Sequence, residues 1–107
     1  MSYFAVVREA GPAWSPGGIF DQPAVDEHAA FMSALAHEGL VLLAGPLAWT
    51  EAGRVRALLV VEAGGEEEIR RRLAADPWAV ADRLCTLSIE PWRILSAAES
   101  LSSAVAV

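Results

Sequence analysis

The segment DEHAAFMSALAHEGLVLLAGPL, residues 26–47, contains the patterns of a helix, a helix stop and a strand in direct succession. Apolar residues recur at spacings of three and four, which predicts an amphipathic helix over residues 24–38. Gly39 is the kind of residue at which helices commonly end. The apolar run that follows predicts a strand over residues 40–49, interrupted by Gly45-Pro46. The chain is therefore expected to fold back from a helix into a strand.

Further strands and a second helix are predicted on either side of this segment. Residues 3–8, 54–63 and 85–95 are short and rich in β-favouring side chains, as is typical of strands. The charged residues 66–75 predict the second helix, and a short helical piece is expected at 79–84. This order predicts a ferredoxin-like α+β sandwich (βαββαβ), a four-stranded antiparallel sheet with two helices on one face. We expect one domain over residues 1–95 and a tail over 96–107.

Both faces of the predicted sheet are hydrophobic. Residues 40–44 and 57–61 are apolar at every position, and two helices can cover only one face of a sheet. The other face would expose an apolar patch on the order of several hundred Å², more than a monomer usually tolerates. We therefore predict a homodimer, or a higher oligomer built on it, in which the sheets pack face to face as a dimeric α/β barrel.

Charge and hydropathy exclude several classes of partner. The net charge is −6 and the eight basic residues are all Arg, so the surface repels phosphate backbones and a nucleic-acid partner is not expected. No apolar run approaches the roughly 18 residues of a membrane span, and the N-terminus lacks the features of a signal peptide. We expect a cytoplasmic protein with no membrane partner.

No cofactor is predicted from the sequence. Two histidines on different helix faces and a single Cys85 do not supply three metal ligands. The Gly-rich SPGGIF at 15–20 lacks the Lys and the strand–helix context of a phosphate loop. Cys85, beside Leu84, is expected to be a small buried hydrophobic residue.

His28 is the first candidate for chemistry. It lies in the middle of the apolar stripe of the helix at 24–38, whereas His37 points to the polar side. The stripe comprises Val25, Ala29, Met32, Leu35 and Ala36. A buried imidazole without a hydrogen-bond partner costs roughly 1–3 kcal/mol. A carboxylate partner would orient it as a general base, and the alternative is a core histidine bonded to a backbone carbonyl.

Asp76, in the Asp76-Pro77-Trp78 break, is the candidate partner. In this fold the end of the second helix approaches the start of the first, which would bring Asp76 toward His28. Asp76 also suits the N-cap of the short helical piece after Pro77. The two interpretations are compatible.

Aromatic residues at loops and element ends are candidates for a pocket. Trp49, Trp78 and Trp92 each stand at the end or break of a predicted element, and Trp14 lies in the first loop. Indole rings at such positions line pockets, plug cores or anchor dimer interfaces. The loop over residues 9–22 is long and Gly-rich, which makes it a candidate lid.

As a set, the segment at 26–47, AADPW at 74–78 and IEPWRIL at 89–95 resemble the YCII-related (YciI-like) family of the dimeric α/β-barrel superfamily. GPAW at 11–14 resembles a sub-group of it. The likeness covers residues 3–95 and implies a ferredoxin-like fold that dimerises through its sheets. It also implies a pocket with a dyad formed by His28 and Asp76.

Three further positions match the family pattern. Gly45 and Pro46 correspond to its Gly-Pro at the end of the second strand, which shapes the pocket wall, and Trp78 is the aromatic residue after Asp-Pro. The family has no single reaction. Its members include enzymes with dehydrochlorinase-like activity on chlorinated aromatics and domains beside transcription-related proteins.

Three functions remain open from the sequence. In the first, a cofactor-independent lyase or isomerase, His28 oriented by Asp76 takes a proton from a small hydrophobic or aromatic molecule. The substrate pocket would be formed by Trp14, Gly45, Pro46, Trp49 and Trp78. The second is a non-catalytic dimeric module that binds a small molecule. The third is a cofactor-free oxygenase.

Overall fold

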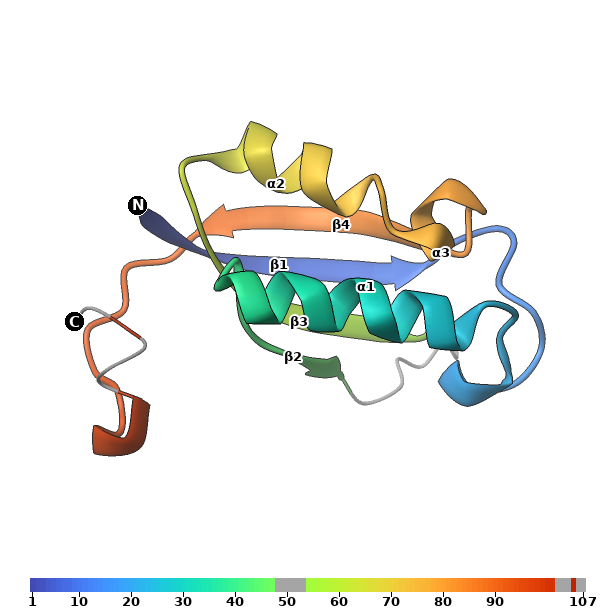
Figure 1. Ribbon diagram of the computed structural model, residues 1–107, viewed down its shortest axis with the longest axis horizontal. Coiled ribbons are helices and arrows are strands. Elements are labelled where there is room, and N and C mark those ends of the chain that lie inside the picture. The colour runs from blue at the N-terminus through green and yellow to red at the C-terminus, as the bar shows by residue number, and fades with distance from the viewer. Residues whose placement is uncertain (48–53, 102–104, 106–107) are drawn as a thin grey trace.

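The structure is a computed structural model that describes residues 1–47, 54–101 and 105. Its strands and helices are β1 (Ser2–Ala10), α1 (Val25–Glu38), β2 (Val41–Pro46), β3 (Arg56–Ala63), α2 (Glu66–Leu73), α3 (Pro77–Val80) and β4 (Leu84–Pro91). Short 3-10 turns lie at Ile19–Asp21 and Glu99–Leu101. The helices stand on one side of the sheet (Figure 1). The predicted ferredoxin-like α+β sandwich is confirmed.

The four strands form one antiparallel sheet in the order β2-β3-β1-β4. Side chains alternate along β1, so that Phe4, Val6, Arg8 and Ala10 are buried on the helix side. Arg8 therefore occupies a position that the strand pattern reserves for the core. β4 is an edge strand and ends at Pro91, as expected for a proline at a sheet edge.

The core lies between the sheet and the helices. Its buried members are Phe4, Val6, Leu35, Leu40, Val41, Leu59, Val61, Ala63, Ile69 and Leu73. α2 supplies two of them from an otherwise charged helix, Ile69 and Leu73, which are spaced by four. Helix α1 ends where predicted, because Gly39 adopts φ 86° and donates its N–H to the carbonyls of Ala36 and Leu35.

Four details differ from the sequence prediction. The last strand ends at Pro91 rather than continuing to residue 95, because the chain leaves the sheet after this proline. Ala29 and Ala36 are exposed, so the buried part of α1 is narrower than the predicted stripe. Cys85 is exposed as well, because Leu84 takes the inward position at the start of β4 and its neighbour points the other way. The short helix begins at Pro77 and ends at Val80 rather than covering 79–84.

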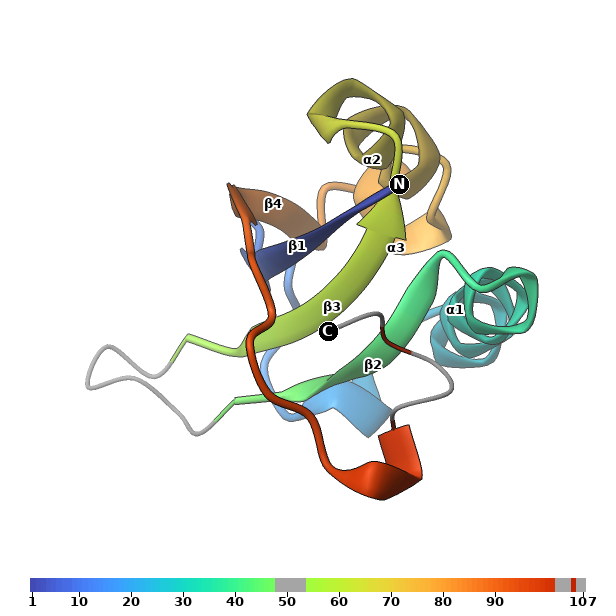
Figure 2. The ribbon, with the colours of Figure 1, turned by 90° about the vertical axis from the view of Figure 1, so that its left-hand side faces the viewer.

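The centre of the sheet face opposite the helices is apolar. Val7 and Leu58 pair across β1 and β3 and are half-buried, and Leu43 at the edge is 55% exposed. The chain after β4 leaves the sheet and runs toward β2 (Figure 2). Ile94, Ala97 and Leu101 of this segment border a hollow together with Leu43 and Val60. The segment from residue 92 to residue 101 therefore covers part of this face near its β2 edge.

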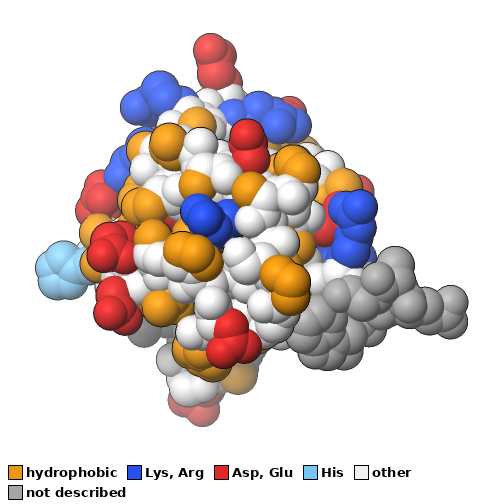
Figure 3. All heavy atoms as spheres, turned by 90° about the vertical axis from the view of Figure 1, so that its right-hand side faces the viewer, with side chains coloured by type: hydrophobic (Ala, Val, Ile, Leu, Met, Phe, Trp, Pro, Cys, Tyr) orange, Lys and Arg blue, Asp and Glu red, His pale blue; other side chains and the backbone are white. Residues whose placement is uncertain are grey.

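The end of the molecule that carries α3 and the start of α1 has a mixed surface. Acidic, basic and hydrophobic side chains are interspersed over it (Figure 3). Among the described residues, no helix is long and apolar enough to cross a membrane.

Candidate active site

The turn between α2 and α3 places Asp76 inside the protein. Its side chain is fully buried, and its Oδ1 accepts the backbone N–H of Trp78 at 2.9 Å. This contact and Pro77 in the first turn make Asp76 the N-cap of α3. The same carboxylate has further partners, so capping is only part of its role in the structure.

His28 is one of these partners. It lies in the first half of α1, where the helix packs against α3, and its side chain is 16% exposed. The imidazole Nδ1 is 2.9 Å from both carboxylate oxygens of Asp76. The contact predicted from the sequence is therefore present in the structure.

Arg8 is a second partner, which the sequence analysis did not include. Its Nη1 donates to Oδ2 of Asp76 at 2.8 Å, and the Arg8 side chain is only 1% exposed. The alternation of β1 contained the signal, because a charged residue two positions after Val6 must point to the same side as Val6. Asp76 therefore bridges a buried arginine and a half-buried histidine.

These partners determine the charge of Asp76. Burial on its own raises the pKa of this carboxyl group. The hydrogen bonds from His28, from the Trp78 N–H and from Arg8, together with the Arg8 charge, outweigh burial and hold the pKa below its ordinary value. An ionised carboxylate only accepts hydrogen bonds, so Nδ1 of His28 must carry a proton. In neutral imidazole the lone pair then belongs to Nε2.

Trp78 packs directly against the imidazole ring of His28, and Trp14 packs against Trp78. Trp78 is 2% exposed and its ring is stacked on His28, with centroids 3.8 Å apart and planes 5° from parallel. The indole Nε1 donates to the carbonyl of Pro23 at 2.8 Å. Trp14 meets Trp78 edge to face at 5.5 Å. The orientation of His28 is therefore fixed by Asp76 at one edge and by Trp78 on one face.

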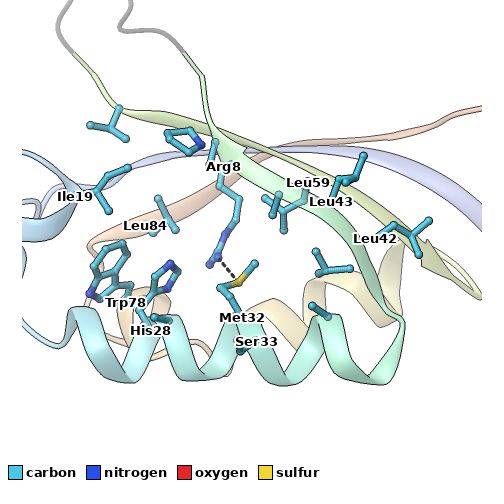
Figure 4. Close-up of a pocket in the computed structure, with 18 of the residues that line it drawn as sticks. Arg8, Ile19, His28, Met32, Ser33, Leu42, Leu43, Leu59, Trp78 and Leu84 are labelled. Carbon is cyan, nitrogen blue, oxygen red and sulfur yellow. Dashed lines mark hydrogen bonds between the residues drawn. The ribbon is translucent and has the colours of Figure 1, made fainter. Parts of the chain in front are cut away.

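A cavity of about 430 Å³ opens beside this cluster, between α1 and the strands β2 and β3. Figure 4 shows His28 and Trp78 at one end of it and Arg8 extending from the sheet toward Met32 of α1. Ala29, Ser33 and Ala36 line its helix side. Because these side chains are small and spaced by four and three along α1, the helix leaves a gap next to β2.

The loop before α1 forms part of the cavity wall. Trp14 and Ile19 border the cavity. Gln22, 3% exposed, accepts from the N–H of Ser15 and donates to the carbonyls of Ser15 and Gly18. Gln22 thus ties this loop into a closed turn, a role that the sequence analysis did not predict. Phe20, in the same loop, is 88% exposed.

The structure brings most of the predicted pocket residues together. Trp14, Gly45, Pro46 and Trp78 all border the cavity that His28 borders. Trp49 lies outside the described residues. Trp92 lies elsewhere, in a hollow formed with Ala5 and Leu58 on the opposite face of the sheet. Among the described residues, no three His, Cys, Asp or Glu side chains are grouped so that they could hold a metal ion.

Comparison with solved structures shows a likeness of fold. No family model and no curated protein matches the chain. Among solved structures it is similar to 5-chloro-2-hydroxyhydroquinone dehydrochlorinase from Burkholderia phenoliruptrix, in complex with 2,5-dihydroxybenzoquinone. The TM-score is 0.51 at 18% identity, over 89% of this chain and 95% of that one. The likeness shows the fold.

Proposed function

We propose that the protein is a cofactor-independent enzyme of the lyase or isomerase type. His28 is its general base, and Asp76 orients His28. The substrate is a small hydrophobic or aromatic molecule that enters the cavity beside α1. The observation that carries this proposal is the 2.9 Å contact between Nδ1 of His28 and Asp76 at the end of that cavity.

The orientation of the imidazole supports the assignment. Since Asp76 holds the proton on Nδ1, the basic Nε2 is the atom left for a substrate. Among the described residues, Nε2 has no hydrogen-bond partner. A general base needs an available lone pair within reach of the proton that it takes. His28 meets the first condition and, as a lining residue of the cavity, is placed for the second.

The fold likeness is compatible with this chemistry. The similar structure is, by its name, a dehydrochlorinase of a chlorinated hydroxyhydroquinone, and it holds a small oxygenated ring. Together with the sequence motifs, this favours membership of the YciI-like group and a substrate of comparable size. Specific binding and catalysis reside in sites rather than folds, so His28, Asp76 and the cavity remain the basis of the proposal.

A non-catalytic binding module is the second candidate, and the Arg8–Asp76 contact favours it. Arg8 balances the charge of Asp76, and a carboxylate that is already paired with an arginine stabilises an imidazolium less than an unpaired one does. In this alternative the cavity binds a metabolite. The contact between His28 and Asp76 then has only a structural role, which is to hold α1 and α3 together at the end of the cavity.

The test is a screen for proton abstraction and elimination. Small hydroxylated and chlorinated aromatics are incubated with the protein in D₂O. Proton abstraction is measured as the loss of C–H signals in NMR spectra, and elimination is measured as chloride release. Oxygen uptake is recorded in parallel to detect the cofactor-free oxygenase. Removing a positioned general base costs about 10²–10⁴-fold in rate, so His28→Gln is expected to lower any turnover by that factor.

The same helix provides a matched control. His37 is exposed in the last turn of α1 and does not border the cavity. His37→Gln therefore makes the identical chemical change outside the candidate site. It is expected to leave turnover unchanged. If His28→Gln and His37→Gln have equal activity, His28 is not the base. Saturable binding without any turnover would instead favour the binding module.

We also infer that two copies pack through the open faces of their sheets. Val7 and Leu58 form the centre of that face, and stable interfaces bury on the order of 1,200–2,000 Å². Leu58→Arg is expected to give monomers in sedimentation, whereas Ala34→Arg on the exposed side of α1 leaves the dimer intact. A wild-type chain that sediments as a monomer at micromolar concentration would contradict this inference.

A further inference from the structure

The side chains around the cavity differ sharply in charge from the protein as a whole. The chain has a net charge of −6. Among the described residues that border the cavity, however, Arg8 and His28 are the only titratable ones, and no acidic side chain is among them. Asp76 lies behind these two residues. With His28 neutral, a molecule in the cavity therefore meets one positive charge in an apolar wall.

Arg8 has hydrogen-bonding capacity that the protein does not use. A guanidinium group has five N–H donors. Nη1 uses one on Asp76 and lies 3.9 Å from the sulfur of Met32. Nε is buried without a hydrogen-bond partner, and Nη2 forms no hydrogen bond with the described residues. A buried donor without a partner costs free energy, so native structures normally satisfy it.

We propose that Arg8 is a specificity-determining residue that binds an ionised oxygen of the substrate, selecting phenolates and enolates on a small apolar ring. This rests on the proposed function and names its substrate class. An oxyanion with a single, delocalised charge suits the site, because one cation in an apolar wall can balance one negative charge. A dianion would leave its second charge without solvation. If the molecule arrives as a phenol, Nε2 of His28 takes the O–H proton. The bonding electron pair then stays on the oxygen, which accepts from Arg8.

Asp76 is part of this arrangement through its position. It accepts a hydrogen bond from Nη1 of Arg8 alone, so Nη2 has no hydrogen bond with the described residues that a ligand would have to displace. It also balances the Arg8 charge when the cavity is empty. When an oxyanion binds and His28 is protonated, the negative charges of the oxyanion and Asp76 are balanced by the positive charges of Arg8 and His28. A charge-assisted hydrogen bond in such a site is stronger than a neutral one.

The test measures binding and needs no turnover. The probe is 4-nitrophenol, whose ionised form absorbs visible light, compared with 4-nitroanisole, which has the same ring and no ionisable proton. A hydrogen bond to a charged group contributes enough to change affinity roughly ten- to hundredfold. We expect the phenolate to bind tighter than the ether by that factor. The pKa of the bound phenol should fall by roughly one to two units.

Variants then assign the effect to Arg8. Arg8→Met should remove the preference for the phenolate, and Arg8→Lys should restore part of it, because it retains the charge without the planar fork. The wild-type comparison of the two probes stands even where a variant fails to fold. Equal affinity for phenolate and ether, no saturable binding of either, or a preference for benzoate over phenolate would overturn the proposal. Phenolate binding without turnover of any phenol would support it while contradicting the proposed enzyme.

Discussion

Replacing Asp76 by Asn tests the charge balance of the buried cluster. The amide keeps an oxygen that can accept the Trp78 N–H, so the cap of α3 can persist, but the negative charge beside Arg8 is lost. Arg8 is 1% exposed and would become a buried cation without a counter-charge. Breaking a buried ion pair in this way costs roughly 3–5 kcal/mol. That is a large part of the 5–15 kcal/mol or so by which domains are stable.

The free energy of unfolding is measured in urea at neutral pH, with tryptophan fluorescence as the signal. Asp26→Asn is the control, since Asp26 is exposed in the first turn of α1 and contributes only about 0.3–1 kcal/mol through the helix dipole. The double variant Arg8→Met with Asp76→Asn removes both charges and should be more stable than Asp76→Asn alone. A loss below about 1 kcal/mol for Asp76→Asn, or a double variant less stable than the single one, would refute the reasoning.

Two further predictions concern the same cluster. The folded pKa of Asp76 lies below its unfolded value of about 3.8, so its contribution to stability is present above that pH and is lost as the pH falls through the folded pKa. Acid titration of stability should therefore be steeper below 3.8 in the wild type than in Asp76→Asn. Trp78→Phe leaves the Pro23 carbonyl without its donor and reduces the stack on His28. It should cost about 1–3 kcal/mol in the urea assay, clearly more than Trp14→Phe, whose indole N–H bonds an exposed carbonyl.

The fold was accessible from the sequence because its signals are local. The Gly39 stop, the apolar run after it and the β-favouring residues at 3–8 are each local signals, and together they allow few topologies. The contact between His28 and Asp76 could be predicted by adding the topology of the fold to these local signals. In this topology the second helix ends near the beginning of the first.

The errors have physical causes that a single sequence conceals. Periodicity gives the direction of a side chain but not the width of the packed stripe, so the predicted stripe includes Ala29 and Ala36, which are exposed and border a cavity. A shift of one residue at the start of β4 moved Cys85 from the inner to the outer face. Gln22 was missed because its hydrogen bonds depend on the path of the loop rather than on local pattern.

The buried charge on Arg8 is the feature that packing alone explains least. Replacing a buried ion pair by well-packed hydrophobic residues is often neutral or stabilising, and Val6 and Ala10 show that the neighbouring inward positions of β1 hold apolar side chains. Nε of Arg8 is buried without a hydrogen-bond partner among the described residues, as are the Nε atoms of Arg56 and Arg83. The carboxylate also holds the proton on Nδ1 of His28 and so leaves Nε2 as the basic atom. Under the proposed function, Arg8 would bind the oxygen of a weakly acidic ring and Nε2 of His28 would take its proton.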